Sequence, residues 1–168
     1  MEFGYTIPLQ RHLKMRLPSS AKATAPFFCW DAHLLTVQKR KAALAINHSS
    51  RYCILLYGLN AVDWKRLPEL MQGEIRAAIL REGLSEFEVA RYFALGGPLK
   101  ISRSHGPEST AALNWAMRAM LPYVSLLDNS RLSQLQIAHI MNGEVYHTAE
   151  PSVRGSPREF FLMGFRHL

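Results

Sequence analysis

The chain has 168 residues, of which 48% are hydrophobic and 20% charged, a balance typical of globular proteins that excludes a disordered chain. No apolar run approaches the roughly 18 residues of a membrane span, and the N-terminus lacks a secretory apolar region, so we expect a cytoplasmic protein without membrane contact. The net charge of +7 favours acidic partners, either nucleic acid or an acidic protein.

The predicted elements begin with a short strand at residues 3–7, followed by a helix for which Pro8 is a suitable first-turn residue. Residues 18–26 are rich in Ser, Ala and Thr and predict a surface loop. Three apolar runs separated by two polar turns come next, which is the pattern of an antiparallel meander. Both faces of this meander are largely apolar, so we expect a sheet that is covered on both sides. Its strands are predicted at 30–37, 42–47 and 52–57.

Helices dominate the remainder of the chain. A helical stripe of apolar residues covers 61–81, and Ser85 begins a capping box that starts a second helix. A short strand is expected at 99–102. Two further helices are predicted at 108–127 and 132–141, and Pro122 is expected to kink or shorten the first of them.

These elements predict an α+β fold with a small, mostly antiparallel sheet of four to five strands, flanked by helices and followed by a helical C-terminal extension. The expected organisation is a core domain over residues 1–127 and an extension over 128–168. The extension ends in a dense apolar segment at 160–165. Such a segment must be covered, so we expect it to pack on the core or to form a homodimer.

The excess positive charge lies in the first third of the chain. Residues 1–58 hold eight Lys or Arg against two acids, which gives +6 of the total +7. The leading hypothesis is therefore a non-catalytic binding protein whose basic face contacts nucleic acid or an acidic protein. The residues expected to make that contact are Lys39, Arg40, Lys41 and Arg51, supported by Arg11 and Lys14.

The turn at 47–51 supports a second hypothesis, a small hydrolase or nuclease of the toxin type. It combines an imidazole, hydroxyls and a guanidinium, which are groups used in acid–base and oxyanion chemistry. Asn and Ser are also the residues that tight turns prefer. The enzyme hypothesis gains if His33 or His105 lies within hydrogen-bond reach of this turn, in a pocket. Its candidate catalytic residues are His48, Arg51 and His33. A third hypothesis is a purely protein-interacting accessory or antitoxin-type factor.

No metal or cofactor is predicted from the sequence. Cys29 and Cys53 lie among apolar residues without the spacing of metal ligands, so both are expected to be buried free thiols. Asp31 and His33 alternate onto one face of their strand, and we expect a buried hydrogen bond between them.

Several motifs resemble the core of a bacterial family of uncharacterised domains. The similarity covers about residues 1–120, and the family has no known activity, so it implies a fold and supplies no catalytic residue. The matching motifs are Trp30-x-Ala32-x-Leu34, Arg40-Lys41, Asn47, Ser50-Arg51-Tyr52 and Leu55-Leu56-Tyr57-Gly58.

Overall fold

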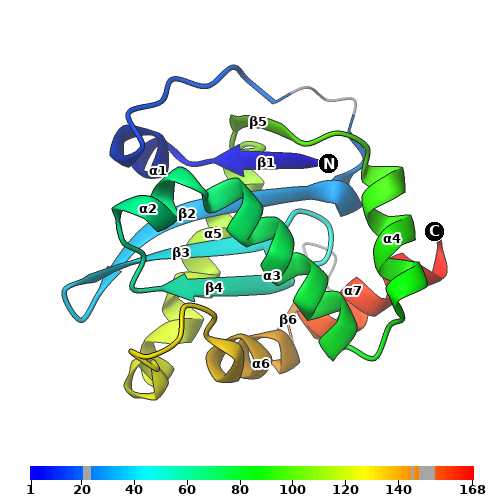
Figure 1. The fold of residues 1–168 in the computed structure, drawn as a ribbon. Helices are drawn as coiled ribbons and strands as arrows, with labels where there is room; N and C mark the ends of the chain where they lie inside the picture. Colours follow the sequence, from blue (N-terminus) through cyan, green and yellow to red (C-terminus); the bar gives the residue numbers. More distant parts are fainter. Residues whose placement is uncertain (21–23, 145, 148–153) are drawn as a thin grey trace.

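A five-stranded sheet forms the centre of the computed structural model, which describes residues 1–20, 24–144, 146–147 and 154–168 (Figure 1). The strand order is β4-β3-β2-β1-β5. The α+β class and all five predicted strands are confirmed. The strands are β1 (Glu2–Tyr5), β2 (Cys29–Val37), β3 (Arg40–Asn47), β4 (Cys53–Tyr57) and β5 (Lys100–Arg103).

The sheet is mixed. Strands β2, β3 and β4 form the predicted antiparallel meander. Strand β1 lies between β2 and β5 and pairs parallel with both, so that Phe3 is opposite Trp30 on one side and Ile101 on the other. The N-terminal strand is therefore internal to the sheet, with a partner strand on each side.

Seven α-helices pack around this sheet in the described part of the chain. The capping box at Ser85 is confirmed, and its helix begins at Glu86. The helix predicted at 108–127 is shorter, since it ends at Met120 and continues as a 3₁₀ segment that contains a proline at its start. The helices are α1 (Ile7–His12), α2 (Ala61–Lys65), α3 (Leu67–Arg81), α4 (Glu86–Gly96), α5 (Pro107–Met120), α6 (Leu135–Gly143) and α7 (Pro157–Arg166).

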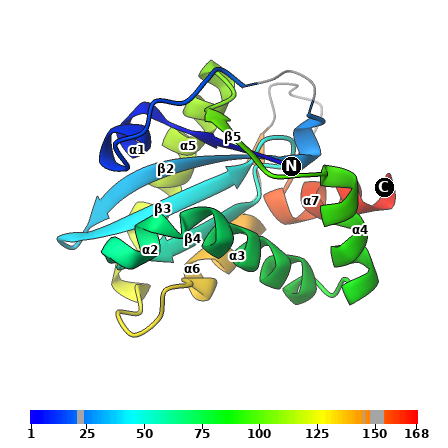
Figure 2. The same cartoon turned by 45° about the horizontal axis from the view of Figure 1, so that its top comes forward.

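Two apolar cores lie on opposite faces of the sheet, as the sequence predicted. Side chains from α3, α4 and α7 pack on one face around Trp30, and side chains from α5 and α6 pack on the other around Leu44. Figure 2 shows α3 in front of the sheet, α5 behind it, and α4 to one side next to α7. No helix in the described residues is long and apolar enough to cross a bilayer.

The apolar segment at 160–165 packs on the chain's own core. The Phe161 ring is fully buried and stacks on Tyr52 with 4.4 Å between ring centroids. The Phe165 ring lies edge-on to Phe161 at 5.2 Å. Helix α7 thus supplies two aromatic rings to the core, and a homodimer contact through this segment stays a prediction.

Candidate functional site

A buried carboxylate, that of Asp31, is the centre of the candidate site. Because side chains alternate along β2, Trp30 and Ala32 point into one core and Asp31 points to the opposite face, which α5 covers. Asp31 is 0% exposed. A buried charge of this kind is tolerated only when hydrogen bonds and an opposite charge compensate for the missing hydration.

Two imidazoles from separate loops approach this carboxylate. The backbone N–H and the Nδ1 of His105 both form hydrogen bonds with Asp31 Oδ1, at 2.8 and 2.9 Å. The Nδ1 of His48 lies 3.5 Å from Asp31 Oδ2, and the two imidazole rings are 5.3 Å apart. Residues 31, 48 and 105 thus form one cluster, here called the Asp31 cluster.

The turn between β3 and β4 holds His48 in position. Asn47 is fully buried, and its Oδ1 accepts hydrogen bonds from the backbone N–H groups of Ser49 and Ser50. The backbone N–H of His48 donates to the carbonyl of Cys29 at 2.8 Å. Asn47, Ser49 and Ser50 therefore build the turn, and His48 is the side chain that the turn presents to Asp31.

The loop after β5 reaches Asp31 because residue 4 is glycine. A Cβ at Gly4 would lie 2.3 Å from Asp31 Oδ1, 2.8 Å from His105 Nδ1 and 2.9 Å from the Ser104 Cα. Any side chain at this position on β1 would separate the His105 loop from β2. The glycine is needed here for close approach of backbone to side chain.

Charge interactions fix the protonation of the cluster. Burial opposes the charge on His105, but its hydrogen bond and ion pair with Asp31 outweigh burial and raise the pKa of His105 to about 10. Burial likewise opposes the Asp31 carboxylate, but hydrogen bonds from His105 and His48 hold its pKa well below the usual range. At neutral pH the two residues form an imidazolium–carboxylate pair.

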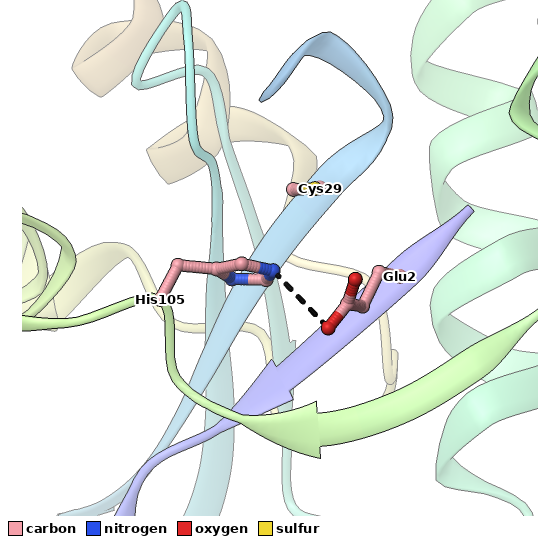
Figure 3. A group of neighbouring side chains, drawn as sticks. All are labelled: Glu2, Cys29 and His105. Atoms are coloured by element: carbon pink, nitrogen blue, oxygen red, sulfur yellow. Dashed lines mark ion pairs between the residues drawn. The ribbon is translucent and has the colours of Figure 1, made fainter. Parts of the chain in front are cut away.

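A second carboxylate lies on the other side of the His105 ring. Glu2 Oε1 is 3.7 Å from His105 Nε2 and accepts a hydrogen bond from Ser102 Oγ at 2.6 Å. Burial opposes ionisation of Glu2, but this hydrogen bond and others lower its pKa. Figure 3 shows Glu2 and His105 pointing toward each other, with Cys29 beside them on β2.

Two groups of side chains in the described residues have donor atoms close enough to share a metal ion. One is Asp31, His48 and His105, and the other is Glu2, Cys29 and His105; within each group the donor atoms lie within 4.8 Å of one another. His105 belongs to both groups. Its Nδ1 faces Asp31 and its Nε2 faces Glu2, so a single ring links the two carboxylates.

The sequence hypotheses about histidine are only partly met. His48 lies in the cluster, and the centroid of the His105 ring is 5.3 Å from that of His48. In the described residues His105 bonds to Asp31 and makes no hydrogen bond to the 47–51 turn. The expected hydrogen bond between Asp31 and His33 is wrong, because His33 Nδ1 instead bonds the Thr6 hydroxyl at 2.9 Å. Asp31 and His33 are two positions apart on β2, which separates them by about 6.6 Å along the strand axis. The pairing of β1 with β2 instead brings Thr6 next to His33.

The predicted basic residues lie at two ends of the sheet (Figure 1). Lys39, Arg40 and Lys41 are exposed at the β2–β3 hairpin, and Lys41 Nζ lies 3.0 Å from the Nδ1 of His12 on α1. Two further predicted cations, Arg11 on α1 and Lys14 just after it, are also exposed. Arg51 is at the opposite end, in the β3–β4 turn that holds His48.

Comparison with known proteins gives a family and a distant structural likeness. A family model described as Domain of unknown function (DUF6933) matches residues 3–160. No curated protein matches the chain. Among solved structures, the crystal structure of the catalytic core domain of BIV integrase is similar, with 11% sequence identity and a TM-score of 0.49, over 82% of this chain and 95% of that one.

Proposed function

Since the chain belongs to the family described as Domain of unknown function (DUF6933), which carries no activity in its description, we propose a function from the Asp31 cluster: a small hydrolase with His48 as general base. The observation that supports this proposal is that the imidazoles of His48 and His105 both contact the buried carboxylate of Asp31. A His–Asp arrangement of this kind orients an imidazole for proton transfer.

The orientation of the His48 ring is the first step of the argument. Its Nδ1 faces inward, 2.8 Å from Ser109 Oγ and 3.5 Å from Asp31 Oδ2. Within the described ranges its Nε2 carries no hydrogen bond, and the side chain is 21% exposed. These contacts fix Nδ1, which leaves Nε2 as the nitrogen that can accept a proton.

Ser109 is a positioning residue in this proposal and not a nucleophile. It is 0% exposed, so a substrate has no access to its hydroxyl. It also meets the same nitrogen of His48 that faces Asp31, whereas a serine nucleophile and its carboxylate partner require opposite nitrogens of the ring. Water is therefore the nucleophile.

The proposed reaction has a simple proton balance. His48 Nε2 takes a proton from water as the water oxygen attacks the electrophilic centre. The bond to the leaving group breaks, and the resulting imidazolium returns the proton to the leaving group. Asp31 stabilises the imidazolium, and the ion pair with His105 keeps Asp31 ionised throughout.

Arg51 supports an anionic substrate. It belongs to the same turn as His48, and its side chain is partly exposed. A guanidinium is suited to bind phosphate oxygens and to stabilise charge that develops on them. With a net charge of +7, the substrate class that fits is a phosphoester, including the phosphodiester of a nucleic acid.

The test is hydrolysis of bis(4-nitrophenyl) phosphate and of single-stranded RNA by the purified chain. We expect His48→Gln to lower kcat by about 10²- to 10⁴-fold, which is the usual contribution of a general base. His139→Gln is the matched control, because His139 is exposed on α6 and should leave the rate unchanged. Equal rates for His48→Gln and the unaltered chain, or no hydrolysis of either substrate, would overturn the proposal.

A second candidate function is the binding of nucleic acid by the hairpin cations. The observation in its favour is that Lys39, Arg40 and Lys41 are all exposed and adjoin the basic end of α1 through the contact of Lys41 with His12. Exposed cations on one surface are the electrostatic footprint of phosphate contact. This surface is distinct from the Asp31 cluster, so binding does not require catalysis.

A further inference from the structure

Three potential metal ligands meet beside the Asp31 cluster although they are far apart in the sequence. They come from the start of β1, the start of β2 and the loop after β5 (Figure 3). The donor atoms of Glu2, Cys29 and His105 lie within 4.8 Å of one another. Glu2 and Cys29 are 1% and 2% exposed, and the His105 side chain is 9% exposed.

Two of these side chains have buried polar atoms without a partner. Glu2 Oε2 and His105 Nε2 make no hydrogen bond in the described part of the chain. The Cys29 thiol makes long contacts, at 3.5 and 3.6 Å, with two backbone carbonyl oxygens, and it also interacts with His105. Leaving a buried polar atom without a partner is unfavourable, so the arrangement favours an additional group between these atoms.

The outer hydrogen bonds of the group are those that orient metal ligands. His105 donates from Nδ1 to Asp31 at 2.9 Å, which directs Nε2 toward Glu2. Ser102 donates to Oε1 of Glu2 at 2.6 Å, the same oxygen that lies 3.7 Å from His105 Nε2, and so orients this carboxylate. A histidine that is bonded to a carboxylate through one nitrogen and faces a metal with the other is a common arrangement around zinc.

We propose that Glu2, Cys29 and His105 bind a divalent cation of the zinc class. A thiolate, an imidazole and a carboxylate together form a donor set that zinc accepts and that magnesium and calcium do not favour. Ligand atoms around a tetrahedral zinc are about 3.5 Å apart, and His105 Nε2 is 3.7 Å from Glu2 Oε1. Three protein ligands leave a fourth position for water.

Between Glu2 and Asp31, the His105 ring supplies one positive charge to two carboxylates. A bound cation replaces the Nε2 proton opposite Glu2, while the Nδ1 proton stays on the Asp31 side. This proposal does not rest on hydrolase activity, because it concerns atoms that His48 does not contact.

The test is titration of the chelator-treated full chain with Co²⁺, a spectroscopic substitute for zinc, followed by displacement with Zn²⁺. We expect one equivalent to bind, with visible bands of tetrahedral cobalt and a near-ultraviolet thiolate band. Cys29→Ser should abolish the thiolate band, whereas Cys53→Ser should retain it, since Cys53 is a second buried free thiol outside the group.

Two conservative variants keep the proposal falsifiable if Cys29→Ser folds poorly. Glu2→Gln should weaken Co²⁺ binding at least tenfold, and Ser102→Ala about tenfold because the hydrogen bond to Glu2 is removed. Circular dichroism checks that each variant is folded. Absence of cobalt binding by the unaltered chain, or undiminished binding by both Glu2→Gln and Cys29→Ser, would overturn the proposal. His48→Gln should retain the cobalt spectrum even where it abolishes hydrolysis.

Discussion

At the scale of single residues, Gly4 has the most constrained surroundings in the candidate site. Its missing side chain allows Asp31 and His105 to meet across β1, because a Cβ there would overlap Asp31 Oδ1 at 2.3 Å. We predict that Gly4→Ala destabilises the fold by about 1–3 kcal/mol, the usual cost of overpacking a core. Chemical denaturation monitored by circular dichroism measures this change. A variant as stable as the unaltered chain would contradict the close approach.

Gly73 provides the matched control for Gly4. It is exposed in the middle of α3, and a Cβ there would meet no atom within 4 Å. Replacing glycine by alanine inside a helix reduces the conformational entropy that the chain gives up on folding. Gly73→Ala is therefore expected to raise the free energy of unfolding by about 0.5–1 kcal/mol, opposite in sign to the change at Gly4.

The site could be predicted from the sequence only in part. His48 stands out because a turn gathers polar groups around it, and Asp31 because it interrupts an apolar strand. Glu2 and Cys29 give no such signal. Metal sites are recognised in a sequence from ligands at short, regular spacings, whereas these two residues are 27 positions apart and both lie far from His105. Their proximity depends on parallel pairing of β1, which local patterns do not encode.

At the scale of elements, α7 packs two of its aromatic rings, Phe161 and Phe165, into the core. Its Phe161 ring is fully buried and contacts Tyr52, Trp30 and Tyr92. We predict that Phe161→Ala lowers the free energy of unfolding by about 3–5 kcal/mol because it leaves a cavity between α7 and the sheet. Thermal and urea unfolding measure the decrease.

The control for Phe161 is Met163, which lies on the same helix and is 47% exposed. Met163→Ala should change stability by less than about 0.5 kcal/mol, as surface substitutions usually do. Equal effects of the two substitutions would mean that α7 does not pack on the sheet. A strong effect at Phe161 alone identifies residues 157–166 as part of the core.

The strands of the sheet followed from alternation and apolar runs, which are local patterns. The meander could be placed from sequence because its strands are joined by short turns. The position of β1 could not, because a strand of four residues carries no information on which partners it will have. Phe3 and Tyr5 of β1 are 0% and 1% exposed, and they belong to the same core as side chains of α3 and α4, which lie much later in the chain.

At the scale of the whole molecule, the exposed cations of the β2–β3 hairpin and of α1 lie at the same end of the sheet. If the hairpin cations contact phosphate, the affinity for DNA or RNA should fall with salt, and the triple variant Lys39→Ala, Arg40→Ala, Lys41→Ala should have a shallower dependence. The slope of log K against log salt is expected to decrease by roughly one unit for each phosphate that the variant no longer neutralises. Fluorescence anisotropy at two salt concentrations measures both slopes.

A second triple variant with the same net charge as the hairpin variant tests whether binding depends on the hairpin or on the total charge. Arg66, Arg76 and Arg131 are exposed and paired with acids elsewhere on the surface, and their replacement by Ala removes the same three charges. This control should bind with an unchanged salt slope. If its affinity falls as much as that of the hairpin variant, the attraction depends on total charge and the hairpin does not bind phosphate.

The internal position of β1 has a consequence for the order of folding. The hydrogen bond between Ser102 and Glu2 joins residues 100 positions apart, whereas the β2–β3–β4 meander is closed by short turns. Contacts between distant residues form later and slow the folding of a domain. A growing chain can therefore complete its meander long before residue 105 is synthesised, and both the proposed catalytic group and the proposed metal ligands assemble only when the last strand of the sheet is in place.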